Sequence, residues 1–210
     1  KVVLPPQLTQ EIPNVDLEKI LSKKFGDEIV AFEKVLANNF SIEDLKLFYS
    51  NLNDLKVIHK NFWLSNLLSH KNVLASYVPK DNELLINSKD YKKSIFHELF
   101  HVASTRFIND FCYSGFFQSS NTTNNGIGEG INEGYTQLLT ERYFDVGCRA
   151  YKYEVDIAKK VEKIVGKEIM ESLYLNADLP GLIFELQQYS PIEEVTDFIT
   201  NVDFLSRYAY

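Results

Sequence analysis

The chain has 210 residues and a formal net charge of −7, with 45% hydrophobic and 24% charged residues. This balance suffices for a packed core and excludes a disordered chain, and an acidic chain of this kind is not expected to bind nucleic acid. No apolar run approaches the roughly 20 residues that span a bilayer, so we expect no membrane span. The chain begins at Lys1 rather than Met, which leaves open whether a signal peptide or prodomain precedes it and in which compartment it works.

The first quarter of the chain is predicted to be mainly helical. Residues 1–14 contain three prolines and read as an extended lead-in. Apolar residues then recur at helical spacing over residues 15–40, which predicts one helix that is bent or broken near Gly26. The segment Ser41–Asp44 is typical of a helix N-terminus, and this second helix is expected to run to about His59.

Two short strands are predicted next, followed by a buried helix. Segments Val73–Val78 and Glu83–Asn87 flank the turn-like Pro79–Asn82, which favours a hairpin. Asp90 can cap a helix that is expected to run to about Arg106, and the apolar residues around most of its surface indicate burial.

The second half is predicted to be a long loop followed by helices. Residues 109–130 are rich in Ser, Asn, Thr and Gly, which predicts a functional loop that walls a cleft. Adjacent residues in a strand point to opposite faces, so at least one of Phe116 and Phe117 is expected in the core. Residues 131–210 predict four or five helices separated by glycines and prolines.

The sequence leaves open whether the two cysteines form a disulfide. Cys112 and Cys148 are too few for a disulfide framework and lack metal-ligand spacing. A single bridge between them would join the cleft wall to the helix that follows it, and two free thiols are the alternative.

A metal-binding pattern lies in the predicted buried helix. In His97-Glu98-Leu99-Phe100-His101 the two imidazoles are four residues apart and project from the same helix face, so both can reach one metal ion. The carboxylate of Glu98 points partly toward the same cleft, where it can exchange a proton with a water. The alternative is two ordinary histidines on a structural helix.

The third ligand must be sought elsewhere, because a catalytic zinc site has three protein ligands and one open position. No His follows His101, and the upstream His59 and His70 read as ordinary surface or boundary residues. Glu133 opens a predicted helix and is the first candidate. Its rival Glu129 is flanked by glycines, which suit a loop better. Two imidazoles and a carboxylate suit zinc better than calcium or magnesium, which prefer all-oxygen sites.

The segment Asn132-Glu133-Gly134-Tyr135-Thr136 resembles the Asn-Glu-Gly-x-Thr stretch that follows HExxH in the gluzincin clan of zinc metallopeptidases, most closely in its small bacterial members. The resemblance covers residues 73–145. It implies a zinc-dependent metallopeptidase acting on a peptide or protein substrate through a metal-activated water. The site residues it implies are the zinc ligands His97, His101 and Glu133, with Glu98 as general acid/base.

The resemblance also implies a fold. We expect a zincin-like α+β fold in which a small mixed sheet packs on the active-site helix and a mainly helical lobe follows. Residues 1–107 would form the N-terminal lobe and residues 108–210 the C-terminal lobe of one catalytic domain. An edge strand, either 76–78 or 83–87, would pair with extended substrate. An endopeptidase is favoured because no acid or Arg cluster that could bind a peptide terminus lies near the motif.

Two departures from the clan's pattern leave an alternative function. Gln137 is expected to accept the free ring N–H of a metal-bound histidine, where related families often have a carboxylate. No later His can stabilise the oxyanion, so other donors must do so. The alternative is a metal-binding but proteolytically weak regulatory or interaction module; the oligomeric state stays open. The candidate oxyanion donors are Tyr135, Tyr151, Tyr153 and Arg142.

Overall fold

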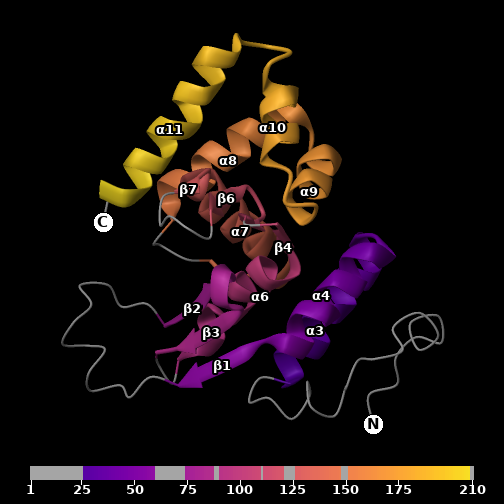
Figure 1. The fold of residues 1–210 in the computed structure, drawn as a ribbon. Helices are drawn as coiled ribbons and strands as arrows, with labels where there is room; N and C mark the ends of the chain where they lie inside the picture. Colours follow the sequence, from indigo (N-terminus) through magenta and orange to yellow (C-terminus); the bar gives the residue numbers. More distant parts are fainter. Residues whose placement is uncertain are drawn as a thin grey trace.

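The computed structural model describes residues 26–59, 74–87, 90–109, 111–120, 126–147 and 151–208. It is a mixed α+β fold, mainly helical, with two small sheets. Helix α6 (Ile95–Ala103) lies between the first helices and sheet on one side and the later helices on the other (Figure 1).

The first two described helices cover one side of α6. Helix α3 (Gly26–Asn39) buries an apolar face, and the predicted helical residues 15–25 before it lie outside the described part of the chain. Helix α4 (Ile42–Asp54) begins at the predicted place, where Ser41 and Asp44 form a capping box. Its predicted extension to His59 is wrong.

The residues after α4 form a strand because they pair with a distant segment. Strand β1 (Lys56–His59) lies parallel to β3 (Glu83–Ile86), and β3 pairs antiparallel with β2 (Ala75–Val78). The predicted hairpin is therefore confirmed, with the 3-10 turn η1 (Pro79–Asp81) between its strands. The strand order β1-β3-β2 makes β2 an edge strand, and β2 packs against α6.

Helix α6 is shorter than the sequence predicts. Asp90 precedes a separate 3-10 turn, η2 (Tyr91–Lys93), and its side chain makes no capping bond, so the predicted cap is wrong. The helix ends at Ala103, and Thr105 and Arg106 already belong to strand β4 (Thr105–Ile108), whose partner is β5 (Phe111–Ser114). Cross-strand pairing ends the helix earlier than its apolar pattern indicates.

The predicted loop over residues 109–130 is wrong, because most of its described residues belong to a second sheet. This sheet is antiparallel throughout, in the order β4-β5-β6-β7. Phe116 is fully buried and Phe117 half-buried, as expected. Cys112 is a free, buried thiol in the structure, and Cys148, its predicted partner in a bridge, lies outside the described residues. The strands after β4 are β5 (Phe111–Ser114), β6 (Phe117–Ser120) and β7 (Gly126–Ile127).

Five helices complete the described chain, as the pattern of glycines and prolines predicts. Gly166, with φ +99°, separates two of them, and Pro180 lies in the first turn of a third. Within the described ranges, none of the helices is both long and apolar enough to cross a membrane. The five are α7 (Glu129–Phe144), α8 (Lys152–Val165), α9 (Lys167–Leu175), α10 (Leu179–Leu186) and α11 (Ile192–Tyr208).

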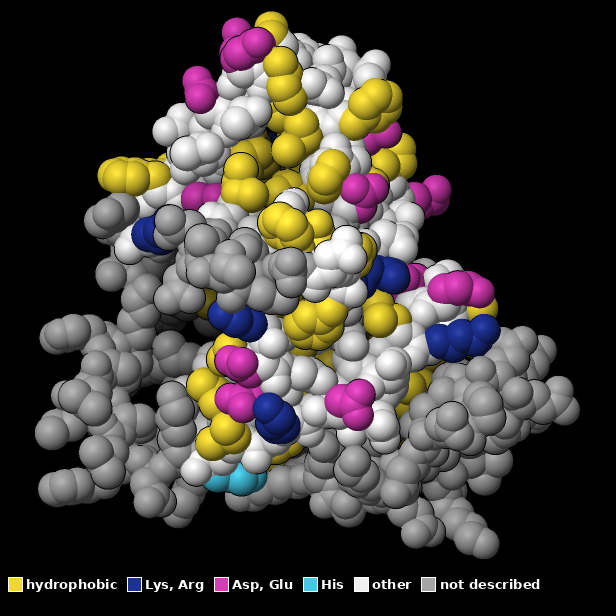
Figure 2. All heavy atoms as spheres, viewed as in Figure 1, with side chains coloured by type: hydrophobic (Ala, Val, Ile, Leu, Met, Phe, Trp, Pro, Cys, Tyr) yellow, Lys and Arg dark blue, Asp and Glu magenta, His cyan; other side chains and the backbone are white. Residues whose placement is uncertain are grey.

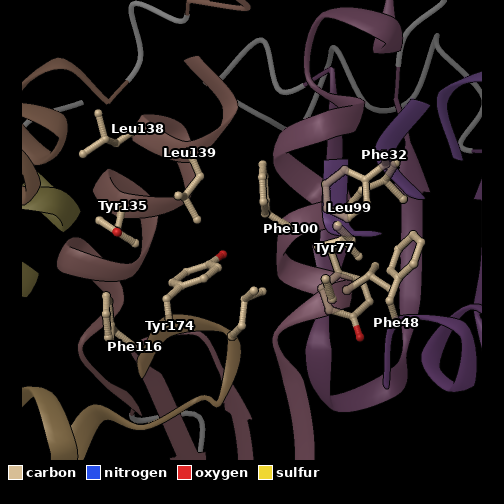
Figure 3. Packing of buried hydrophobic residues seen from close by; sticks show 14 of the residues in the cluster. Phe32, Phe48, Tyr77, Leu99, Phe100, Phe116, Tyr135, Leu138, Leu139 and Tyr174 are labelled. Atoms are coloured by element: carbon tan, nitrogen blue, oxygen red, sulfur yellow. The ribbon is translucent and has the colours of Figure 1, made fainter. Parts of the chain in front are cut away.

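The core runs through α6. Figure 3 shows Phe100 of α6 between two groups of buried side chains, one around Phe32 and the other around Tyr135 and Tyr174. The Phe100 and Phe32 rings are 4.7 Å apart in an edge-on contact. All four residues belong to one buried cluster, so the position of α6 is set by apolar packing from both sides.

Candidate metal centre

The two histidines of α6 lie next to each other on the face toward α7. His97 and His101 are one helical turn apart, their Nε2 atoms are 3.1 Å apart, and both are buried. The remaining faces of α6 are fully buried by apolar residues such as Leu99 and Phe100. The helix therefore cannot turn without exposing apolar surface, which fixes the direction of the imidazoles.

Glu133 comes to the same point from α7. One carboxylate oxygen lies 3.0 Å from His97 Nε2 and the other 3.4 Å from His101 Nε2. One ligand atom from each of these three residues lies within 4.8 Å of the others, so the group can hold a metal ion. Glu129, the rival ligand, lies outside the group; its side chain is exposed and pairs with Arg207 at 3.1 Å.

The charge state of Glu133 suits a metal ligand. Burial alone would raise the pKa of this carboxyl, but the charge of His101 and hydrogen bonds to His101 and His97 outweigh burial and hold the pKa well below its usual range. The carboxylate is therefore ionised at neutral pH. The group therefore offers a metal ion two imidazole nitrogens, from His97 and His101, and one carboxylate oxygen, from Glu133.

Glu98 is in a different environment from Glu133. Its carboxylate is buried and accepts a hydrogen bond of 2.8 Å from the backbone N–H of Tyr77 on β2. Burial, with a smaller contribution from the charge of Glu133, raises the pKa of Glu98 to about 7, against the opposing effects of His97 and the Tyr77 N–H. At neutral pH this carboxyl can both accept and release a proton.

Gln137 holds the ring of His97 through the atom that the sequence suggests. Its Oε1 lies 3.2 Å from His97 Nδ1, and its Nε2 donates to the carbonyl of Val146 at 3.0 Å. Because the amide nitrogen faces Val146, the oxygen faces the ring. Nδ1 of His97 can therefore donate to Gln137, and Nε2 is the ring nitrogen directed toward Glu133 and His101.

Asn132 is a site residue that sequence reasoning missed. Its Oδ1 accepts the N–H of Phe116 at 2.9 Å, and its Nδ2 lies 3.4 Å from His101 Nδ1. The amide thus places the β5–β6 turn against the ring of His101 without giving that ring an acceptor. The sequence feature that could have identified Asn132 is its position next to Glu133 in the Asn-Glu-Gly-x-Thr stretch.

The candidate oxyanion donors occupy four different environments. The Tyr151 ring stacks on His97, with centroids 5.2 Å apart and an interplanar angle of 9°. Tyr135 is fully buried and donates to Glu162. Tyr153 is 66% exposed on a different surface, and Arg142 pairs with two glutamates behind α7. Among these four, Tyr151 alone lies at the site. His59 is exposed at the end of β1, and His70 lies outside the described residues.

A cleft of about 200 Å³ opens over the metal group. Strand β2 forms one wall. Asn87 N–H donates to the carbonyl of Leu74, so alternate residues of β2 bond to β3, while Ala75 and Tyr77 direct their backbone groups toward the open edge. The residues lining the cleft are Ala75, Ser76, Tyr77, Pro79, Glu98, His101, Phe117, Glu129, Asn132, Glu133 and Tyr151.

Two larger cavities, of about 420 and 340 Å³, lie away from the metal group, along the grooves between α8, α10 and α11. Figure 2 shows hydrophobic side chains gathered on this part of the surface. The exposed apolar residues of these helices and of the turn between α10 and α11 include Tyr153, Ile164, Phe184, Tyr189, Phe198, Phe204 and Leu205.

Comparison with known proteins gives no relative: no protein-family model, no curated protein and no solved structure matches this chain. The function of the chain is therefore inferred from the geometry of the metal group and the cleft above it.

Proposed function

We propose that this chain is a zinc-dependent metallopeptidase of the gluzincin type, with a zincin-like fold, that hydrolyses peptide bonds with Glu98 as general acid/base. One observation carries the proposal. His97, His101 and Glu133 converge from two helices within 4.8 Å, while Glu98 lies beside them, buried and outside the ligand group.

The donor set fits zinc. Zinc takes imidazole nitrogen and carboxylate oxygen, and its catalytic sites have three protein ligands, whereas calcium and magnesium prefer oxygen alone. When bound, zinc supplies a Lewis acid that polarises a carbonyl and lowers the pKa of a coordinated water. His97, His101 and Glu133 would hold the ion, and the cleft would admit the substrate.

Glu98 supplies the proton transfers. Its carboxylate takes a proton from the attacking water and passes it to the leaving amine, and a pKa near 7 suits both directions. The N–H of Tyr77 holds the carboxylate in place. Tyr151, which lines the cleft and stacks on His97, is the residue proposed to stabilise the oxyanion.

The substrate backbone is proposed to bind along the free edge of β2. Ala75 offers its N–H and C=O and Tyr77 its C=O along the cleft, while the Tyr77 N–H is already used by Glu98. An extended peptide can pair with these groups as an added strand. Such binding on both sides of the bond favours an endopeptidase.

Gln137 supports the alternative of a metal-binding, proteolytically weak module. An amide oxygen is a weaker acceptor than a carboxylate, so the His97 ring beside it donates less electron density to the metal. The exposed apolar residues of α8, α10 and α11 could then serve a regulatory or interaction role.

Metal analysis with two variants tests the proposal. Protein purified without added zinc should contain about one zinc ion per chain. Glu98→Gln should keep the zinc and lose hydrolysis of a mixed peptide library by about 100-fold or more. Glu133→Gln should lose the zinc, and Glu129→Gln is the matched control that should keep it. Zinc without hydrolysis in the wild type would favour the module, and no zinc uptake on titration would rule out both functions.

A further inference from the structure

The last helix of the described chain holds the beginning of the helix that carries Glu133. Asp203 of α11 is 5% exposed. One of its carboxylate oxygens accepts the backbone N–H of Gly128 and the other that of Gly130, both at 2.8 Å. These two glycines are the N-cap residue and the second residue of α7.

Helix α7 has no cap of its own. Its N-cap residue is Gly128, with φ +85°, so no local side chain can accept the first free N–H groups of the helix. Asp203 supplies that acceptor from 75 residues away, and its negative charge at the N-terminus also interacts favourably with the helix dipole.

The two helices touch at this point with no room for a larger side chain. A Cβ atom on Gly130 would lie 2.6 Å from the carbonyl oxygen of Val202, and one on Gly128 would lie 2.0 Å from that of Phe116. Both distances are shorter than any normal contact, so glycine is required at each position. The backbone of α11 is thus in direct contact with the first turn of α7.

We propose that Asp203 is a positioning residue for the metal centre, acting through the first turn of α7. Glu133 follows Gly130 by less than one turn, and the neighbouring Asn132 lies against His101. A shift of this turn would move the carboxylate of Glu133 relative to the imidazoles of α6. The inference rests on the metal-binding part of the proposed function.

A second link between the same elements is much weaker. Arg207 pairs with Glu129 at 3.1 Å, but both side chains are nearly half exposed, and exposed ion pairs contribute little to stability. The buried carboxylate of Asp203, with two backbone donors, is therefore the contact through which α11 determines the position of α7.

Cap removal at two sites tests the proposal. Asp203→Asn and Asp203→Ala are compared with Asp178→Asn and Asp178→Ala, because Asp178 caps α10 through a bond of 2.8 Å from Gly181 N–H and touches no residue of the metal group. Zinc affinity is measured by competition with a chromophoric chelator, and the visible spectrum of bound cobalt reports the ligand geometry. Hydrogen exchange reports the opening of residues 128–133.

All variants should melt at lower temperature than the wild type. The Asp203 variants alone should bind zinc about 10-fold more weakly, within the range found for residues that orient metal ligands. They should also change the cobalt spectrum and speed exchange in residues 128–133. Asp203→Asn keeps the shape of the side chain and serves as the readout if Asp203→Ala does not fold.

The proposal would be overturned by Asp203 variants with wild-type zinc affinity, or by equal losses of affinity at Asp203 and Asp178. A wild type that binds no zinc would instead refute the proposed function. Hydrogen exchange in the metal-free protein would then decide whether Asp203 holds the first turn of α7, and unchanged exchange would refute that too.

Discussion

The two helices that form the metal group are held in different ways. Helix α6 is packed by apolar residues on both sides, and Ile95, Leu99, Phe100 and Val102 are fully buried. The buried residues of α7 include many polar ones, such as Asn132, Thr136, Gln137 and Thr140. Apolar packing is distributed over many contacts, whereas a hydrogen bond depends on one partner. Helix α6 is thus held by apolar packing, whereas α7 combines apolar packing with individual polar contacts of Asn132 and Gln137.

Truncating the centre of the α6 packing should have the largest effect on stability. Phe100→Ala removes a fully buried ring that contacts Phe32 and the later helices, and we expect it to lower the free energy of unfolding by about 3–5 kcal/mol. Phe184→Ala is the matched control, because Phe184 is 61% exposed and its truncation should change stability by less than about 0.5 kcal/mol. Urea denaturation of both variants makes the comparison; equal losses would contradict apolar control of α6.

Glu98 is a buried acid in the otherwise apolar helix α6. The free-energy cost of burying its charged form should make the stability of the metal-free protein depend on pH. Burial raises the pKa of Glu98 from 4.5 to about 7, so the folded state binds this proton more tightly than the unfolded chain. Stability should therefore fall as the pH rises from about 4.5 to about 7 and then level off. At about 1.4 kcal/mol per pKa unit, the loss approaches 3 kcal/mol.

Denaturation across this pH range in a chelating buffer measures the effect. The reference is Glu98→Gln, which keeps the size of the side chain without its titration. The difference in unfolding free energy between wild type and variant should change by up to about 3 kcal/mol between pH 4.5 and 7. Parallel curves would show that burial does not shift this carboxyl.

Breaking a polar contact of α7 should cost less than breaking the packing of α6. Arg142 bonds Glu162 at 2.6 Å and Glu171 at 2.8 Å, and Arg142→Gln leaves the buried Glu171 without its strongest partner. We expect a loss of about 1–3 kcal/mol, measured by urea denaturation. Arg207→Gln, which removes an exposed pair with Glu129, should change stability by less than about 1 kcal/mol. A larger loss for Arg207→Gln would reverse this ranking.

The smallest expected change sharpens the role of Gln137. Gln137→Glu places a carboxylate beside His97 Nδ1, where the amide oxygen now lies 3.2 Å away. A stronger acceptor makes the imidazole a better donor, so zinc affinity should rise by about 10-fold. Chelator competition measures this change, and a peptide library shows whether hydrolysis rises with it. Tighter zinc without faster hydrolysis would favour the regulatory or interaction module.

The metal group was predictable because its signal is local. His97 and His101 share a face by helical periodicity alone, and Glu133 was selected because no later histidine exists. The hairpin of β2 and β3 and the five C-terminal helices follow from turn residues and apolar spacing in the same way. The choice of Glu133 used the absence of histidine from the rest of the chain, and each of the other inferences needs only residues within a few turns or one hairpin.

The second sheet was missed because its strands do not look like strands in isolation. Residues 117–120 have the sequence Phe-Gln-Ser-Ser and are followed by Asn, Thr and Gly residues, which favour turns. Pairing with β5 and β7 makes them strands. Strand β1 was mistaken for the end of a helix for the same reason, since its partner β3 is distant in the chain.

The amino-acid sequence by itself determined the two histidines, the acid between them and the candidate carboxylate, because helical periodicity sets which neighbours share a face. Tertiary structure alone decided which tyrosine lies at the cleft, that Asn132 borders His101, and that Asp203 caps α7 from the last helix. These contacts join residues far apart in the chain. Their formation depends on how the elements pack together, which no local pattern records.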